Sequence, residues 1–425
     1  MKKVFLAVIV FLFAFLFVVC NSSNLDRTSG IKSDSEAYEH PSAPPSYPGG
    51  DYPVSEESGD GGNQNKPGAG LLTSAEWSDI KNYSFYLNLF DIADDPDTEE
   101  GQSRNSFSQY INYFGFETRY MLTVNVVCGG SPAGDAVVDL YDSDQTILFS
   151  AKTDVLGYAY LFPSYDLSGE NITIKASSGS HESLQSFDYT DGDLQITLDG
   201  QETPKSVLDL MFVIDTTGSM GDELNYLKEE ISDVISAISE KNPLYSINLA
   251  LLFYRDIGDE YVTKYFDFTP DIAEQQKNLS RQSANGGGDF PEAVDKALSE
   301  AVEKNWSSNY ATRLIFHVCD APPHDTQENQ TLFFNSVKAA SKKGIRIIPV
   351  ASSGIDSATE FLLRQEALMT GGTYIFLTDD SGIGESHLEP TVGEFTVEYL
   401  NACMVRVVNE YLTGIETDPA PYWTP

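Results

Sequence analysis

Basic residues are scarce in this sequence of 425 residues. It has 26 Lys and Arg against 64 Asp and Glu, which gives a formal net charge of −38. A surface of that sign repels nucleic-acid phosphates and anionic lipid headgroups, so we expect no nucleic-acid partner. The same charge favours the accumulation of divalent cations near the protein.

Cysteine is rare as well. The four cysteines form no Cys-x-x-Cys pair, which argues against a zinc ribbon or a redox motif. Cys319 and Cys403 lie in apolar stretches and are expected to be small buried hydrophobic residues. A disulfide is compatible with the sequence, which leaves its connectivity open.

The first twenty residues predict a targeting segment. Lys2 and Lys3 precede an apolar run over residues 4–19, and Cys20 ends it. The run is shorter than the roughly 20 residues that comfortably span a bilayer. It resembles a bacterial lipoprotein signal with Cys20 as the lipidated residue, although Val19 and Phe17 replace the usual small residue and leucine. An uncleaved anchor and ordinary secretion are the alternatives, and all three predict export to the cell envelope or beyond.

Composition divides the next two hundred residues into three parts. Residues 21–70 are rich in Pro, Gly, Ser and acidic residues, which predicts a disordered acidic linker. In residues 71–118, Ser74 is positioned to cap a short helix that carries Trp77, and we expect a strap on the next domain. Residues 119–199 show apolar residues at every second position between turn signals, which predicts a small all-β sandwich.

Two stretches of this predicted sandwich carry a family resemblance. They are Gly-Asp-Ala-Val-Val-Asp-Leu-Tyr at 134–141 and Thr-Asp-Val-Leu-Gly-Tyr-Ala at 153–159. Together they resemble the carboxypeptidase regulatory-like domain. The resemblance implies a spacer or presentation role without catalysis.

Residues 204–413 alternate between apolar strands and amphipathic helices. Buried strands are predicted at 207–214, 246–253, 314–319, 345–350 and 373–377, with an edge strand at 261–269. Helices are predicted at 220–238, from Pro291 to 306, up to Gly344, at 358–369 and at 397–411. This alternation predicts an α/β doubly wound parallel sheet, followed by a tail at 414–425.

Oxygen-bearing side chains follow two of the buried strands. The first strand ends in Asp215, Thr217 and Ser219, and the strand at 314–319 ends in Asp320. Between them a Gly-Gly-Gly-Asp-Phe-Pro-Glu loop contains Asp289. Ligands of doubly wound sheets bind at the carboxyl ends of the strands, and hard cations prefer oxygen ligands. The three loops therefore predict a site for a divalent cation.

These motifs in combination resemble a von Willebrand factor type A domain with a metal-ion-dependent adhesion site. By that resemblance, Thr217 and Ser219 coordinate Mg²⁺ directly, with Mn²⁺ or Ca²⁺ as alternatives, and Asp215 and Asp320 act mostly through water. Asp289 stands where many members have a threonine, so it becomes the candidate fifth ligand. The closest resemblance is to bacterial surface proteins.

Other interpretations of the same residues were weighed. The Asp-Thr-Thr-Gly-Ser turn could be only a helix cap, and Asp289 could only cap the helix that begins at Pro291. His317, Asp320 and His324 suggest zinc, but the rest of the predicted pocket is oxygen. The glycine run lacks the Gly-Lys-Ser/Thr of a phosphate loop, and Ser219 lacks the first glycine of a nucleophile elbow.

The function predicted from the sequence is a metal-dependent adhesion-type module without enzymatic activity. Its expected partner is a protein or glycan that offers a carboxylate to the metal. One alternative is a structural component of an envelope complex that the metal only stabilises. A less favoured alternative is a metal-assisted hydrolase, for which His324 is the one candidate base.

Overall fold

The computed structural model describes residues 68–90, 107–189, 193–200, 206–308 and 310–422. The predicted signal with Cys20 and nearly all of the predicted linker at 21–70 lie outside these residues. Within the described ranges, no helix combines the length and the apolar character that crossing a bilayer requires.

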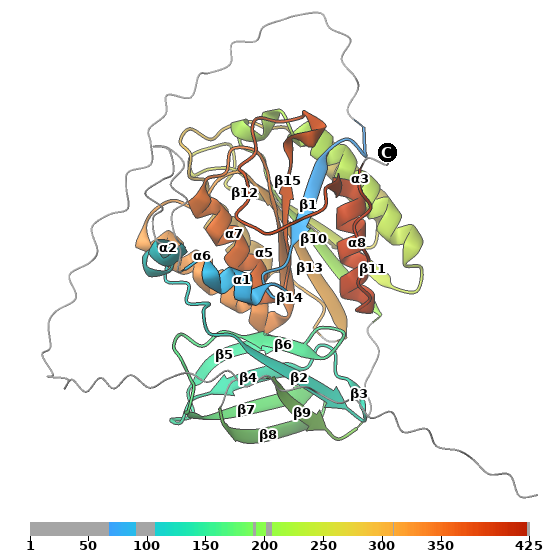
Figure 1. Cartoon of the computed structure of the whole chain (residues 1–425). Helices are drawn as coiled ribbons and strands as arrows, with labels where there is room; N and C mark the ends of the chain where they lie inside the picture. The colour runs from blue at the N-terminus through green and yellow to red at the C-terminus, as the bar shows by residue number, and fades with distance from the viewer. Residues whose placement is uncertain (1–67, 91–106, 190–192, 201–205, 309, 423–425) are drawn as a thin grey trace, which may run out of the picture. The chain divides into compact units, whose positions relative to one another are not determined.

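The larger part of the described chain is built around an eight-stranded sheet (Figure 1). Five neighbouring strands run parallel, as predicted. Their order is β11 (Ser246–Tyr254), β10 (Val207–Asp215), β13 (Ala311–Cys319), β14 (Ile345–Ala351) and β15 (Tyr374–Leu377). The sheet as a whole is mixed, because β12 (Thr263–Thr269) pairs antiparallel with β11, and β1 (Thr73–Trp77) pairs antiparallel with β15 and with β16 (Glu398–Tyr399).

Helices cover both faces of this sheet (Figure 1). One apolar core joins the sheet to α3 (Leu224–Lys241), α4 (Ile272–Ser280) and α8 (Leu400–Thr413). The other joins it to α5 (Val294–Glu303), α6 (Gln327–Lys343) and α7 (Ser357–Thr370). Alternate residues of β10 enter opposite cores, which explains why the strand is apolar throughout.

Capping residues bound α6 and α7, and α6 ends at Gly344 as predicted. Thr326 accepts the backbone N–H of Asn329 at the start of α6, and Gly344 ends it with φ of 70°. Asp356 accepts the N–H of Thr359 at the start of α7. Such caps satisfy backbone groups that have no partner within the helix.

Two predictions about local structure are wrong. Ser74 does not cap a helix but lies in β1, where it pairs with Leu377 at the edge of the main sheet. Helices follow later, at α1 (Tyr83–Asn88) and α2 (Phe107–Phe114). The helix expected from Pro291 begins at Val294, and Glu292 before it forms an isolated β-bridge with Pro323.

The strands of residues 122–198 form two further four-stranded sheets. One contains β2 (Leu122–Cys128), β3 (Ser131–Pro132), β6 (Tyr158–Leu161) and β9 (Leu194–Leu198). The other contains β4 (Val137–Tyr141), β5 (Ile147–Lys152), β7 (Asn171–Ser178) and β8 (His181–Asp188). Cys319 and Cys403 are buried free thiols, which confirms the expectation for both.

Candidate functional site

The first loop of the candidate site directly follows β10. Asp215 is fully buried, and its Oδ1 accepts hydrogen bonds from the Thr217 backbone N–H (2.8 Å) and hydroxyl (2.7 Å). The Thr217 hydroxyl lies 3.1 Å from that of the exposed Ser219. No side-chain cap bond is made at the short helical turn of residues 218–221. The three side chains therefore bond to one another, which the capping interpretation does not explain.

Asp320, which follows β13, joins this group. It is 4% exposed, and burial followed by the negative charge of Asp215 raises its pKa well above the usual range, although a bond with Ser219 opposes the shift. Burial also raises the pKa of Asp215. Oδ2 of Asp215 and Oδ1 of Asp320 are buried without a hydrogen-bond partner among the described residues. Each of these two acids thus has a buried oxygen that receives no hydrogen bond from the described residues, and the charge of Asp215 acts on Asp320.

The glycine-rich loop is attached to the first loop through its backbone. The Asn285 N–H donates to the Thr216 carbonyl (3.0 Å), and the Gly218 N–H donates to the Gly286 carbonyl (3.1 Å). The Gly287 N–H donates to Asp259 at 2.9 Å. Gly286 and Gly287 have φ of 84° and 73°, a conformation that favours glycine. The loop is therefore held against Thr217.

Within this loop, the two acidic residues Asp289 and Glu292 differ in burial. Asp289 is exposed, whereas Glu292 is 3% exposed and has an unpaired buried Oε2. Burial, and then the charges of Asp215, Asp256 and Asp320, raise the pKa of Glu292 to about 10. Sequence reasoning missed Glu292, although its place directly after Pro291 in the glycine-rich motif was a usable signal.

A buried polar chain supports Asp215 from behind. The charge of Asp215 contributes, after burial, to raising the pKa of Tyr254. The Tyr254 hydroxyl lies 3.3 Å from Nε2 of His317, whose Nδ1 lies 2.9 Å from Glu366. Burial alone would lower the pKa of His317, but Glu366 outweighs it and raises it. His317 is therefore a core residue paired with a carboxylate.

Two more histidines lie against acids near the site. Nε2 of His324 lies 2.6 Å from Asp256, so the candidate base of the hydrolase interpretation already has a partner. His387 lies between Glu223 (3.1 Å) and Asp379 (2.7 Å). Glu223 is 1% exposed, and its Oε2 has no partner among the described residues.

The residues at this edge fit a hard divalent cation. Four buried carboxylate oxygens that have no donor within the described residues belong to Asp215, Asp320, Glu292 and Glu223. In residues 68–422, apart from the gaps given above, no three His, Cys, Asp or Glu side chains are close enough to hold an ion by themselves. A site here therefore depends on the hydroxyls of Thr217 and Ser219 and on water as further oxygen ligands.

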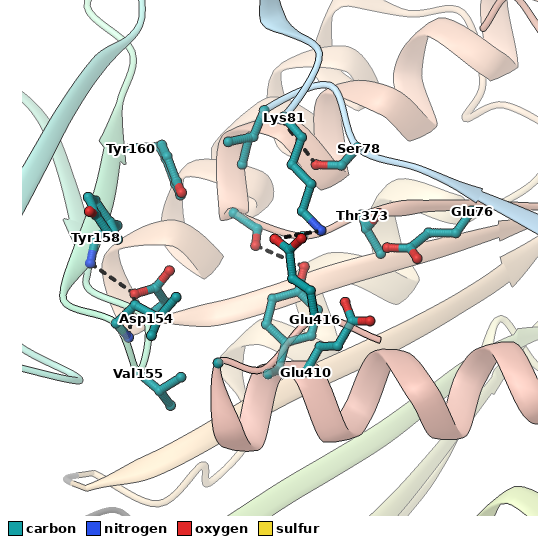
Figure 2. A pocket seen from close by; sticks show the side chains of 16 residues that line it. Glu76, Ser78, Lys81, Asp154, Val155, Tyr158, Tyr160, Thr373, Glu410 and Glu416 are labelled. Carbon is teal, nitrogen blue, oxygen red and sulfur yellow. Dashed lines mark hydrogen bonds and ion pairs between the residues drawn. The ribbon is translucent and has the colours of Figure 1, made fainter. Parts of the chain in front are cut away.

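A separate cavity of about 290 Å³ lies at the opposite edge of the sheet, where Gly371–Thr373 lead into β15 (Figure 2). Four acidic side chains line it: Asp154 accepts the backbone N–H groups of Leu156 and Tyr158, and the three glutamates have cationic partners. Glu76 and Glu410 pair with Arg406 at 2.7 and 3.1 Å, and Glu416 pairs with Lys81 at 3.2 Å. Each of these three glutamates thus has a cationic partner, in contrast to the acids after β10 and β13.

A family model described as von Willebrand factor A domain matches residues 209–379. Residues 209–379 are a von Willebrand factor A domain. The matched range contains the three loops of the candidate site. Domains of this family commonly mediate adhesion and protein–protein interaction.

Three curated relatives share part of the chain. R811 of Acanthamoeba polyphaga mimivirus, named as an ariadne-like RING finger protein, is 26% identical over 231 residues, which is 50% of this chain and 22% of R811. Alpha-protein kinase vwkA of Dictyostelium discoideum is 30% identical over 121 residues, 28% of this chain and 19% of the kinase. Mouse hemicentin-1 is 27% identical over 199 residues, 46% of this chain and 3% of hemicentin-1. The chain thus spans less than a quarter of each relative, and the activities in their names are those proteins' own.

Proposed function

We propose that the von Willebrand factor A domain of this chain binds a partner protein through a divalent cation held at the carboxyl ends of β10 and β13. The observation that carries the proposal is the pair of unpartnered, buried oxygens on Asp215 and Asp320 beside the hydroxyls of Thr217 and Ser219. A cation supplies the positive charge that these acids lack. Mg²⁺ is the expected ion, because every candidate ligand is oxygen.

Each residue has a distinct part in this proposal. Thr217 and Ser219 offer neutral oxygens, and the exposure of Ser219 leaves the ion accessible from solvent. Asp215 and Asp320 supply negative charge at buried positions. The polar chain of Tyr254, His317 and Glu366 keeps Asp215 oriented. We propose no reaction at this site.

Calorimetry with Mg²⁺ and Mn²⁺ tests the metal site. We expect the full-length chain to bind, and Asp215→Asn to abolish binding while the far-ultraviolet spectrum stays unchanged. A concentration of metal 100 times Kd should stabilise the wild type by about 2.7 kcal/mol. Equal affinities of wild type and variant would remove the basis of the proposal.

A pull-down separates the adhesion role from a merely structural one. Surface-exposed proteins captured by the wild type in Mg²⁺, but not in EDTA, support metal-dependent binding. If the same proteins are captured in EDTA while the fold stays intact, the result supports the structural alternative, in which the metal only stabilises the domain. Asp215→Asn in Mg²⁺ is the matched control, and it should behave like the wild type in EDTA.

We propose further that the chain is exported and lipid-anchored at Cys20, and that the two small sheets are a carboxypeptidase regulatory-like spacer. The motif residues at 134–141 and 153–159 support the spacer, and the apolar run before Cys20 supports export. Metabolic labelling with a radioactive fatty acid tests the anchor, since Cys20→Ser should lose the label. Equal labelling of both chains would refute lipidation at Cys20.

A further inference from the structure

Three consecutive backbone N–H groups just before β1 converge on one buried carboxylate of α3. The N–H of Gly70 donates to Oε2 of Glu230 at 2.8 Å. The N–H groups of Leu71 and Leu72 donate to Oε1 of the same residue at 2.8 and 3.0 Å. Glu230 is fully buried, and a buried carboxylate is costly unless hydrogen bonds satisfy it. The carboxylate and this segment therefore depend on each other.

The segment continues as β1, and we call residues 70–77 the latch. β1 pairs with β15 on one side and with β16 on the other, and β16 has no further strand partner within the described ranges. The Leu72 carbonyl accepts the N–H of Leu400, the first residue of α8, at 2.9 Å. The Thr73 carbonyl accepts the N–H of Thr378, which follows β15, at 3.0 Å. The latch thus binds α3, α8 and the end of β15 at once.

The latch reaches the first loop of the candidate site through α3. This helix begins at Leu224, shortly after Ser219. Leu72 of the latch belongs to the same apolar core as Leu224 and Met220. Met220 lies in the short helical turn that also contains Ser219. The latch therefore shares a core with the turn that carries a predicted ligand.

A second path leads from the latch through the loop after β15. Thr73 is bonded to Thr378, and the next residue, Asp379, lies 2.7 Å from Nδ1 of His387. Nε2 of His387 lies 3.1 Å from Glu223, which directly precedes α3. Both paths therefore end at the start of α3, beside the candidate site.

We propose that docking of the latch and binding of the metal are coupled, because the docked latch fixes the start of α3 and so positions the loop of residues 215–219 for the cation. This inference rests on the proposed function. Coupling is reciprocal, so the bound metal strengthens the docking of the latch in turn. The chain continues on the amino-terminal side of Gly70, so a pull from that side acts on the latch and lowers the metal affinity.

Mn²⁺ titration of full-length chains tests the coupling from the side of the latch. Glu230→Gln removes the charge and replaces one acceptor oxygen by an amide, so we expect Mn²⁺ binding to weaken about 10-fold, as is typical of coupled sites. Glu229→Gln, the exposed neighbour with the same change in charge, is the matched control and should bind like the wild type. A wild type that binds no Mn²⁺ overturns the proposed function and this inference with it.

Hydrogen exchange measured by mass spectrometry reports on the latch itself. In EDTA, residues 70–77 should exchange faster in Glu230→Gln than in the wild type or in Glu229→Gln. Unchanged exchange in Glu230→Gln overturns its part in docking the latch. Faster exchange combined with wild-type Mn²⁺ affinity overturns the coupling and leaves the proposed function standing.

The reciprocal effect is measured in the wild type alone. Saturating Mn²⁺ should slow exchange of residues 70–77 by about the same factor by which Glu230→Gln weakens Mn²⁺ binding. Strand β11, near the other end of the sheet, is the reference. Equal slowing in β11 and in the latch would mean that the latch opens only when the whole domain unfolds, which overturns its regulatory role.

A second variant weakens the same contact from the latch side. Gly70 has φ of 74°, so Gly70→Ala strains the backbone, although the added Cβ meets only Nδ2 of Asn401 at 3.8 Å. It takes the place of Glu230→Gln if that chain does not fold. Gly68→Ala, whose added Cβ meets nothing within 4 Å, is its matched control. A folded Gly70→Ala with faster exchange at residues 70–77 and wild-type Mn²⁺ affinity overturns the coupling.

Discussion

The two edges of the main sheet treat buried acids in opposite ways. At the amino ends of the strands, Asp135 receives two hydrogen bonds from Arg313 at 2.8 and 3.1 Å and an ion pair from Lys152 at 3.2 Å. At the carboxyl ends, Asp215 and Asp320 keep oxygens without any donor among the described residues. A buried charge is costly unless it is paired. Asp135 therefore has cationic partners within the chain, whereas Asp215 and Asp320 keep unpaired oxygens at the edge where we propose that a cation binds.

The largest effect on stability is expected from removing Arg313, a cation that pairs with Asp135 at the amino ends of the strands. Arg313 is 2% exposed, and Arg313→Met removes its ion pair with Asp135, whose side chain is 5% exposed. We expect the free energy of unfolding to fall by about 3–5 kcal/mol. Urea denaturation in EDTA measures the loss, and the double variant Arg313→Met/Asp135→Asn should recover part of it. A single variant as stable as the wild type would show that this pair does not balance the edge.

Removing a buried negative charge at the carboxyl edge should instead raise the free energy of unfolding when no metal is present. Asp320→Asn replaces a buried charge by an amide that can donate to the unpaired Oδ2 of Asp215. In EDTA we expect the variant to be more stable than the wild type by about 1–3 kcal/mol. In saturating Mg²⁺ the order should reverse, because only the wild type gains from the metal. A variant less stable in both conditions contradicts the comparison.

Sequence patterns anticipated one edge better than the other. The strand β10 and the Asp-Thr-Thr-Gly-Ser turn are local features, so their place at the carboxyl edge followed from the pattern. The burial of Glu292 was not predicted, because it depends on a bridge to Pro323 that the spacing of the motif does not reveal. The strand β1 was missed for a similar reason, since its partner β15 lies about 300 residues away in the sequence.

A smaller effect is expected at His387, which holds Glu223 and Asp379 beside the carboxyl edge. Burial would lower its pKa, but hydrogen bonds to both acids raise it above 6.5. A raised pKa in the folded state contributes stability that is complete below the unfolded value and is lost as pH rises through the folded one. The lowered pKa of Asp379, caused first by its bond with His387, adds stability above pH 3.8.

His387→Gln should therefore cost about 1 kcal/mol between roughly pH 4 and 6.5, a modest amount because Asp379 is exposed. Above the raised pKa of His387, the two proteins should converge. Melting temperatures of both proteins from pH 4 to 9 in EDTA measure the difference. If the difference in melting temperature stayed constant across this range, His387 would stabilise the fold by packing and not through its positive charge.

The smallest effect is expected at Asp356, an acid of the carboxyl edge that has hydrogen-bond donors. It tests whether the stability change on removing an acid depends on its position at this edge or on its hydrogen-bond partners. Asp356 follows β14 at this same edge, but it is satisfied by the N–H (2.7 Å) and hydroxyl (2.6 Å) of Thr359 at the start of α7. Asp356→Ala should cost about 1 kcal/mol, as the loss of a helix cap does. The cost should be the same in EDTA and in Mg²⁺, because Asp356 has its own donors. If Asp356→Ala were instead more stable than the wild type in EDTA, it would behave as we expect of Asp320→Asn. The excess negative charge would then belong to the whole carboxyl edge and not to the acids with unpaired oxygens.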